Sequence, residues 1–319
     1  MRKSIVSLVV ILSASASAND YKNTPRVAVD LNKAPQFSVV GQLTWQKILA
    51  NGDTVEYQGS GTIISPCYVL TNYHVIDGAV GEIRFRAGQR GDPGMFAGDT
   101  TAAPAMVSDY HNDHTDDWAI MRLHQCAGRV KGYGWAEITT RTTRQLIAAH
   151  TKVGLAGYSY KTRTNARMSY STGTITGLWP YDHRSMMFSA SMTPKQSGSP
   201  LFAMEDGIMK LVGLNTAQVR GYDASGKEID IFPTYSSESA NLAQGVFEIL
   251  NRPEVKALLD ADKATVGANP TLYRLSAALP AAVGCGRAGD SLGDGFCVPT
   301  EETDKENIWA GDYELPKDH

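Results

Sequence analysis

Short apolar or alternating runs, separated by turn residues, make up most of the chain from Gln36 onward. Turn signals rich in Gly, Asp and Asn, such as Glu205-Asp206-Gly207, divide these runs. Many short strands at regular spacing are typical of antiparallel sandwiches or barrels rather than of strand–helix–strand units. The pattern therefore predicts an all-β fold. The clearest predicted strands are Phe37–Val40, Gly61–Ile64, Ile83–Arg86, Trp118–Met121, Met168–Ser171 and Met209–Val212.

Helical periodicity appears only late in the chain. Ala243–Leu250 and Pro253–Leu259 are predicted to be helical, and Pro253 falls in the first turn of its helix, where the missing N–H is tolerated. Residues 263–319 follow as a C-terminal extension rich in Gly, Ala and acidic residues.

The first eighteen residues, Met1–Ala18, have the pattern of a secretory signal peptide. Arg2 and Lys3 supply the positive start, Ile5–Leu12 the apolar centre, and Ala16-Ser17-Ala18 the small-residue cleavage motif. The alternative, a membrane anchor, needs about 20 apolar residues, and this run is far shorter. We therefore expect an exported protein, secreted or periplasmic, with no membrane anchor in the mature chain. Residues 19–34 are polar and unpatterned, which fits a short propeptide or an N-terminal arm.

Length and charge set limits on the class of protein. A chain of 319 residues is long enough for one large all-β unit or two modest domains. The net charge of −3 gives no strong attraction to nucleic acid or to acidic membranes. We expect a protein or peptide partner and no nucleic acid.

Ser197 lies in the most informative segment, Lys195–Phe202, where a turn precedes Gly-Ser-Pro and an apolar run. Such a turn exposes a hydroxyl and gathers backbone N–H groups around it. A serine hydroxyl becomes nucleophilic when a histidine takes its proton and a buried carboxylate orients that histidine. His74 and Asp117 lie upstream, so the three residues follow one another in the order His, Asp, Ser. Enzymes of the α/β-hydrolase fold use another order and a G-x-S-x-G elbow, and no such elbow surrounds Ser197. Asp116 is the rival carboxylate, but Asp117 directly precedes an apolar strand, where burial begins.

These segments resemble those of the bacterial trypsin-like serine peptidases, in particular the glutamyl endopeptidase group. The similarity runs from about Pro35 to Asp262. It implies a peptidase domain at 35–262 with two six-stranded antiparallel β-barrels, at about 35–140 and 141–262, a C-terminal helix, and an active site between the barrels. The motifs that carry it are Thr71–Val75, Asp117–Ile120, Val153–Tyr158, Ser171–Thr176, Gln196–Pro200 and Leu211–Asn215.

The resemblance implies an endopeptidase in which Ser197, His74 and Asp117 act without a cofactor, and the backbone N–H groups of Lys195 and Ser197 form the oxyanion hole. The family nearly always has glycine where this chain has Lys195. Two alternatives stay open. Either Lys195 accepts a left-handed backbone at a cost of about 1 kcal/mol, or the hole forms only with substrate. A trypsin-fold binding module without a working oxyanion hole is therefore the alternative function.

The resemblance also assigns the primary specificity pocket. Its base is expected near Ser191, and its wall at Asn215, Thr216, Ala217 and Gln218. No Asp lies at the base, which argues against a preference for Arg or Lys. Glutamyl endopeptidases have a histidine where this chain has Asn215, so a glutamate preference is not implied. Thr216 is expected to hydrogen-bond the Asp117 carboxylate, as a hydroxyl does in relatives.

Gln196 replaces the aspartate that zymogen-type relatives pair with a new N-terminal ammonium. A neutral amide cannot form that ion pair. Activation by an inserted N-terminus is therefore not expected.

Four cysteines in an exported chain indicate two disulfides. Cys285 and Cys297 are close in a Gly-rich loop, which leaves Cys67 to pair with Cys126; the alternative is that the latter two are buried thiols. No metal site is expected. The loop with His111 and His114 and the Gly-rich tail loop both lack a recognisable ligand spacing.

Overall fold

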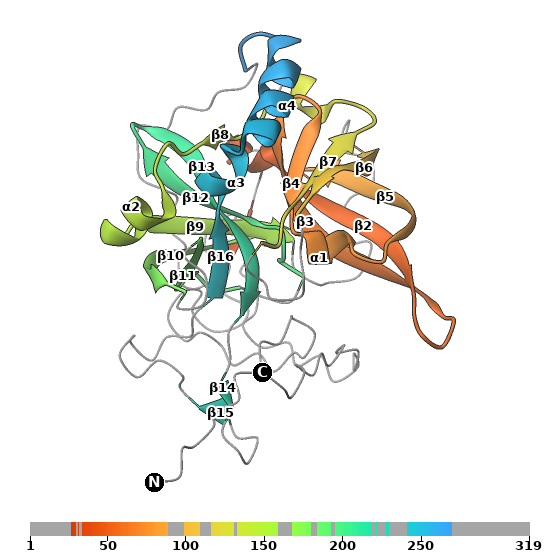
Figure 1. The fold of residues 1–319 in the computed structure, drawn as a ribbon, viewed down its shortest axis with the longest axis horizontal. Coiled ribbons are helices and arrows are strands. Elements are labelled where there is room, and N and C mark those ends of the chain that lie inside the picture. Colours follow the sequence, from red (N-terminus) through yellow and green to blue (C-terminus); the bar gives the residue numbers. More distant parts are fainter. Residues whose placement is uncertain are drawn as a thin grey trace.

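The computed structural model describes residues 27–29, 31, 34–88, 99–108, 116–130, 133–158, 168–179, 184–192, 195–218, 221–222, 228–229 and 241–269. Two antiparallel barrels lie side by side within this part of the chain (Figure 1). The predicted all-β class with two six-stranded barrels is therefore confirmed.

The first barrel closes because β2 (Val40–Ile48) pairs with β5 (Val80–Ala87), which is the fourth of its strands in chain order. Its interior follows the two-residue period of the sequence, because Ile83, Phe85 and Ala87 point inward while the residues between them are more exposed. In spatial order, its strands are β2 (Val40–Ile48), β3 (Thr54–Ser65), β4 (Tyr68–Thr71), β7 (Ala119–Leu123), β6 (Asp99–Val107) and β5 (Val80–Ala87).

The second barrel closes because β9 pairs with both β10 and β12. Two short strands extend it: β1 (Val27–Ala28) pairs with β10, and β8 (Glu137–Ile138) runs parallel to β13. A separate hairpin joins β14 (Gly221–Tyr222) and β15 (Glu228–Ile229). The barrel strands, in spatial order, are β9 (Lys152–Tyr158), β10 (Met168–Leu178), β11 (Ser185–Phe188), β16 (Asn241–Gly245), β13 (Ile208–Gln218) and β12 (Pro200–Glu205).

Two of the predicted elements begin three residues later in the structure than in the sequence prediction. Phe37–Val39 belongs to a 3-10 helix, η1 (Pro35–Val39), and the strand begins only at Val40. The first late helix, α3 (Val246–Leu250), starts three residues after the predicted Ala243, because Asn241–Gly245 pairs with β11 and β13. Ladder pairing therefore overrides local helical periodicity here. The remaining helices are α1 (Tyr73–Ile76), η2 (Ala127–Arg129), α2 (Thr143–Ala148) and α4 (Pro253–Ala264), with Pro253 in the first turn as predicted.

Helix α4 docks on the first barrel at the turn between β3 and β4 (Figure 1). Asp262 accepts hydrogen bonds from Ser65 Oγ at 2.7 Å and from the Cys67 backbone N–H at 2.8 Å. Cys67 also forms a disulfide with Cys126, as expected. The helix and the disulfide together fasten this end of the barrel.

Part of the N-terminal arm belongs to the folded domain. Val27–Ala28 adds a strand to β10, Val29 N–H donates to Met168 O at 2.9 Å, and Leu31 is buried in the core. The predicted signal peptide, the loop with His111 and His114, Cys285, Cys297 and the tail beyond residue 269 lie outside the described residues. Among the helices that the structure does describe, none has the length and apolar character needed to cross a membrane.

Candidate active site

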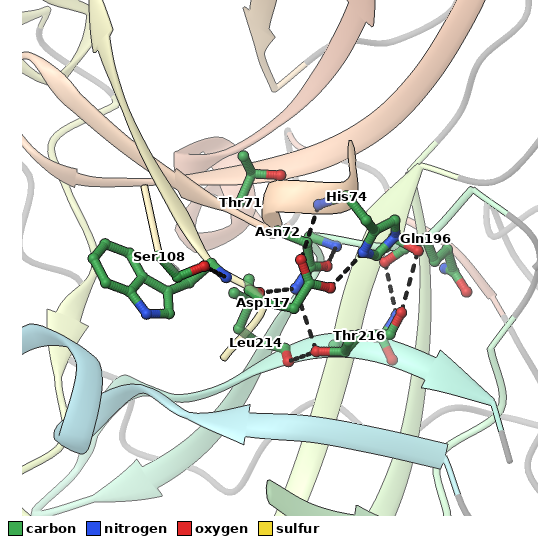
Figure 2. A network of polar contacts seen from close by, with 12 residues as sticks. Thr71, Asn72, His74, Ser108, Asp117, Gln196, Leu214 and Thr216 are labelled. Atoms are coloured by element: carbon green, nitrogen blue, oxygen red, sulfur yellow. Dashed lines mark hydrogen bonds and ion pairs between the residues drawn. The ribbon is translucent and has the colours of Figure 1, made fainter. Parts of the chain in front are cut away.

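His74 and Asp117 meet at the ends of two paired strands. Strand β4 leads directly into α1, which carries His74, while Asp117 lies two residues before β7, and the Thr71–Ala119 pairing sets the register. The two oxygens of Asp117 make separate contacts: Oδ1 accepts the His74 backbone N–H at 2.9 Å, and Oδ2 hydrogen-bonds the Nδ1 atom of the ring (Figure 2). Asp117 is fully buried, whereas the His74 side chain is 15% exposed. This contact leaves the ring's Nε2 as the proton acceptor.

Asp116 is engaged elsewhere. It accepts hydrogen bonds from Arg252 at 2.7 and 2.9 Å and from the Trp118 indole N–H at 2.8 Å. The Arg252 guanidinium also lies 4.9 Å from the centre of the Trp118 ring. Asp116 therefore ties the start of α4 to the first barrel, and Asp117 alone of the two carboxylates contacts His74.

Ser197 lies in a β-turn closed by the Ser199 N–H and the Gln196 carbonyl at 3.0 Å. Gly198 occupies the third turn position with a φ of 79°, which favours glycine. A Cβ atom at Gly198 would also collide with the Ser60 carbonyl and the Thr71 hydroxyl. The turn is attached to the first barrel, because Ser60 N–H donates to Ser197 O at 2.9 Å.

The Ser197 hydroxyl donates to the Thr216 carbonyl at 3.4 Å. Within the described residues, no hydrogen bond joins Ser197 to His74. Catalytic hydrogen bonds are often long or unmade in free enzymes and form only with substrate. The structure thus brings His74 and Asp117 into direct contact, while Ser197 is linked to them through the segments around it.

Lys195 has a φ of 71°, a left-handed backbone that favours glycine. Such a conformation costs a non-glycine residue about 1 kcal/mol or somewhat more. Of the two sequence-based alternatives, this backbone angle fits the one in which the loop accepts the strain. Within the described ranges the Ser197 backbone N–H has no protein acceptor, as a group that awaits a substrate oxygen requires.

Thr216 is the extra residue of a β-bulge between β13 and β16, where Asn215 pairs with Ala243 and Ala217 with Leu242. Bulges re-aim side chains and occur next to active sites. Here the Thr216 hydroxyl donates to Leu214 O at 3.2 Å and accepts from Asn72 Nδ2 at 3.3 Å (Figure 2). The bond expected between Thr216 and the Asp117 carboxylate is replaced by this link through Asn72.

Of the other residues assigned to the pocket, Asn215, Ala217 and Gln218 lie on β13, whereas Ser191 follows β11. Ser191 is nearly buried, and its carbonyl accepts the Ser171 hydroxyl at 2.5 Å. Asn215 is fully buried and donates to Gln196 O at 2.8 Å, while its Oδ1 atom has no partner among the described residues. Ala217 is fully buried, and Gln218 ends β13.

Gln196 is buried and donates to the Ser169 hydroxyl at 2.8 Å. Ser169 lies on β10, opposite Ala28 of the N-terminal strand. A neutral amide–hydroxyl contact thus supports the residue before Ser197. In the same strand, burial raises the pKa of the Tyr170 phenol above its ordinary value.

Sequence reasoning missed Ser60 and Asn72, which link the serine turn to the first barrel. Ser60 lies in the middle of a strand with no local signal. Asn72 stands directly before α1, where an asparagine is typical of a helix N-cap, and none of its neighbours in the sequence indicates another role. Within the described residues, no group of three or more His, Cys, Asp or Glu side chains is placed to hold a metal ion.

Residues 59–214 match the family model of the trypsin-like peptidase domain. No curated protein sequence matches the chain significantly. Many solved structures share the fold. One of them is a Glu endopeptidase in complex with MPD, with a TM-score of 0.52 and 17% identity over 76% of this chain and 98% of that one. The family-model match over residues 59–214 includes His74, Asp117 and Ser197.

Proposed function

We propose that this chain, which carries a trypsin-like peptidase domain, is an exported serine endopeptidase with His74, Asp117 and Ser197 as its catalytic triad. The family match and the fold support a serine peptidase. The observation that carries the triad is the two-point contact of Asp117 with His74, which orients the ring and leaves Nε2 for a proton.

In the proposed reaction, the Ser197 hydroxyl turns from Thr216 toward His74 and attacks the substrate carbonyl carbon. Its proton passes to Nε2 of His74, and the negative charge develops on the carbonyl oxygen. The N–H groups of Lys195 and Ser197 hold this oxygen. The C–N bond then breaks, His74 returns the proton to the leaving amine, and an acyl-enzyme remains.

Water completes the cycle. His74 takes a proton from the water as it attacks the acyl carbon, and it returns that proton to Ser197 when the ester bond breaks. Asp117 stays ionised throughout and stabilises the charged imidazole. Each step uses only side chains and backbone groups of this chain.

A fluorophosphonate probe tests the proposal, because it forms a bond only with an activated serine. We expect the folded protein to be labelled at Ser197 and Ser197→Ala to remain unlabelled. Ser199→Ala is the matched control: Ser199 is a buried serine two residues away, its hydroxyl has no partner among the described residues, and labelling should persist.

One observation favours a second candidate, a binding module that keeps the fold without catalysis. The Ser197 hydroxyl bonds Thr216, and Lys195 stands where relatives have glycine. Absence of labelling in the folded protein, with and without a peptide present, would favour this candidate.

Export and specificity have separate tests. N-terminal sequencing of the exported protein should find Asn19 as its first residue if Met1–Ala18 is a signal peptide. Profiling of cleaved peptide ends should show internal cleavage without a preference for Arg or Lys. A strong cleavage preference after basic residues would contradict the proposed pocket around Ser191 and Asn215.

A further inference from the structure

Asn72 directly precedes α1, but its side chain does not make the contact that is usual for an asparagine at that position. It is the N-cap residue of this short helix, with an extended backbone (φ −80°, ψ 152°), but its side chain does not cap the helix. Asparagine at this position normally accepts a hydrogen bond from the second or third helical N–H. The side chain of Asn72 is thus diverted from its ordinary use.

Asp117 performs the capping instead. Its Oδ1 atom accepts the N–H of His74, the second helical residue, at 2.9 Å. The carboxylate that orients the imidazole therefore also satisfies the helix end. This arrangement frees the Asn72 side chain to turn toward the second barrel.

Asn72 makes three hydrogen bonds, one within the first barrel and two to the second, and its side chain is fully buried (Figure 2). Its Oδ1 atom accepts the Gly198 N–H at 2.5 Å, while Nδ2 donates to Asp117 O at 2.8 Å and to Thr216 Oγ1 at 3.3 Å. The orientation of the amide is fixed, because Gly198 N–H is only a donor and Asp117 C=O only an acceptor. The Asn72 side chain thus links Asp117, the Ser197 turn and the Thr216 bulge.

We propose that Asn72 is a positioning residue that sets the Ser197 turn against the His74–Asp117 pair across the barrel interface. This inference rests on the proposed peptidase function. Gly198 directly follows the nucleophile, and its N–H is shared between Asn72 Oδ1 and the Asn215 carbonyl, the latter at 3.0 Å. Asn72 therefore holds the turn from the side of the base, and Asn215 holds it from the second barrel. A displacement of about 1 Å at a reacting group can reduce rate about 100-fold.

Asn72→Ala removes all three bonds, and Asn72→Ser is a milder variant whose hydroxyl is too short to span them. The measurement is the first-order labelling rate constant with a fluorophosphonate and the acylation rate per titratable site with an activated ester. Both quantities are independent of how much of the protein is folded. We expect each rate to fall about 10- to 100-fold, with KM changed less than about threefold.

Thr139→Val is the matched control. Thr139 is also buried, and its hydroxyl donates to Glu205 at 2.6 Å, away from the site. We expect this variant to melt at a lower temperature, as Asn72→Ala does, but to keep the wild-type rate per site. A residue that only stabilised the fold would behave in the same way as Thr139.

Two results would overturn the role of Asn72: wild-type rates per site in both Asn72 variants, or failure of both to give any titratable site while Thr139→Val folds. Either result leaves the peptidase proposal intact as long as the wild type is labelled at Ser197. Absence of labelling in the folded wild type would instead reject the peptidase function itself.

Discussion

The two barrels hold their parts of the candidate site in different ways. In the first barrel, His74 and Asp117 stand at the ends of two paired strands and contact each other twice. In the second barrel, Ser197 lies on a turn between two residues with left-handed backbones, Lys195 and Gly198, and its hydroxyl bonds Thr216. The first arrangement follows from strand register, whereas the second depends on contacts from outside the turn.

The contacts that hold the turn come from both barrels. Ser60 binds the Ser197 carbonyl, Asn72 binds the Gly198 N–H, and Asn215 binds the Gln196 carbonyl. A ladder distributes strain over many bonds, but a turn with few bonds transmits the loss of each one. We therefore expect changes near the turn to alter both folding and activity, while changes at the first-barrel pair alter mainly activity.

The adjacent carboxylates give the largest expected difference. Asp117→Asn keeps the size of the side chain but removes the charge that orients His74, and we expect kcat/KM to fall about 10⁴-fold. Asp116→Asn weakens the contacts with Arg184, Arg252 and Trp118, none of which involves His74, so kcat/KM should stay within about threefold, with about 1 kcal/mol lost in the free energy of unfolding. Steady-state kinetics measure kcat/KM, and denaturant unfolding measures the free energy of unfolding of each variant. Equal losses of activity in the two variants would mean that Asp117 is not the orienting carboxylate.

Gly198→Ala tests the dependence of the serine turn on its backbone. The added methyl group meets the Ser60 carbonyl and the Thr71 hydroxyl, and φ is 79°. We expect a loss of about 2–4 kcal/mol in the free energy of unfolding, and a labelling rate at least about 100-fold lower. Gly52→Ala is the control, because Gly52 also has a positive φ but no atom lies near its Cβ position. Wild-type labelling in Gly198→Ala would show that the turn tolerates displacement.

The sequence was sufficient for the parts of the site that depend on local pattern. The apolar strand after Asp117 predicted its burial, and the position of Lys195 gave a left-handed backbone as one of two alternatives. The short-strand pattern and the family resemblance together predicted the barrels. These features could be read because each one lies within a few residues of its signal.

The missed features depend on pairs far apart in the chain. The link from Asn72 to Gly198 spans 126 residues, and no local pattern reports it. The Thr216 bulge arises from a register shift between β13 and β16, which neither strand encodes alone. The predicted helix begins at Val246 rather than at Ala243 for the same reason, since pairing with neighbouring strands decided residues 241–245.

Removal of the Cys67–Cys126 disulfide tests the independence of the first-barrel pair. The bridge closes a separation of 59 residues, and its loss in Cys67→Ala/Cys126→Ala should cost about 2–4 kcal/mol in the free energy of unfolding. The bond lies beside Asp262 at the far end of β4 from His74, so the labelling rate per titratable site should not change. A decrease in that rate would show that the ladder alone does not hold His74 and Asp117 in place.

Lys195→Gly should have the smallest effect. Glycine relieves a left-handed backbone that costs about 1 kcal/mol, but it also adds freedom to the unfolded chain, so the free energy of unfolding should change by less than about 1 kcal/mol. The acylation rate per site should be equal or modestly higher, since the backbone angle that presents the N–H is already adopted by lysine. Lys195→Val is the control, because a β-branched residue resists this backbone angle and should lower the rate. If glycine raised the rate by several orders of magnitude, the lysine would be the element that keeps the second-barrel half of the site inactive.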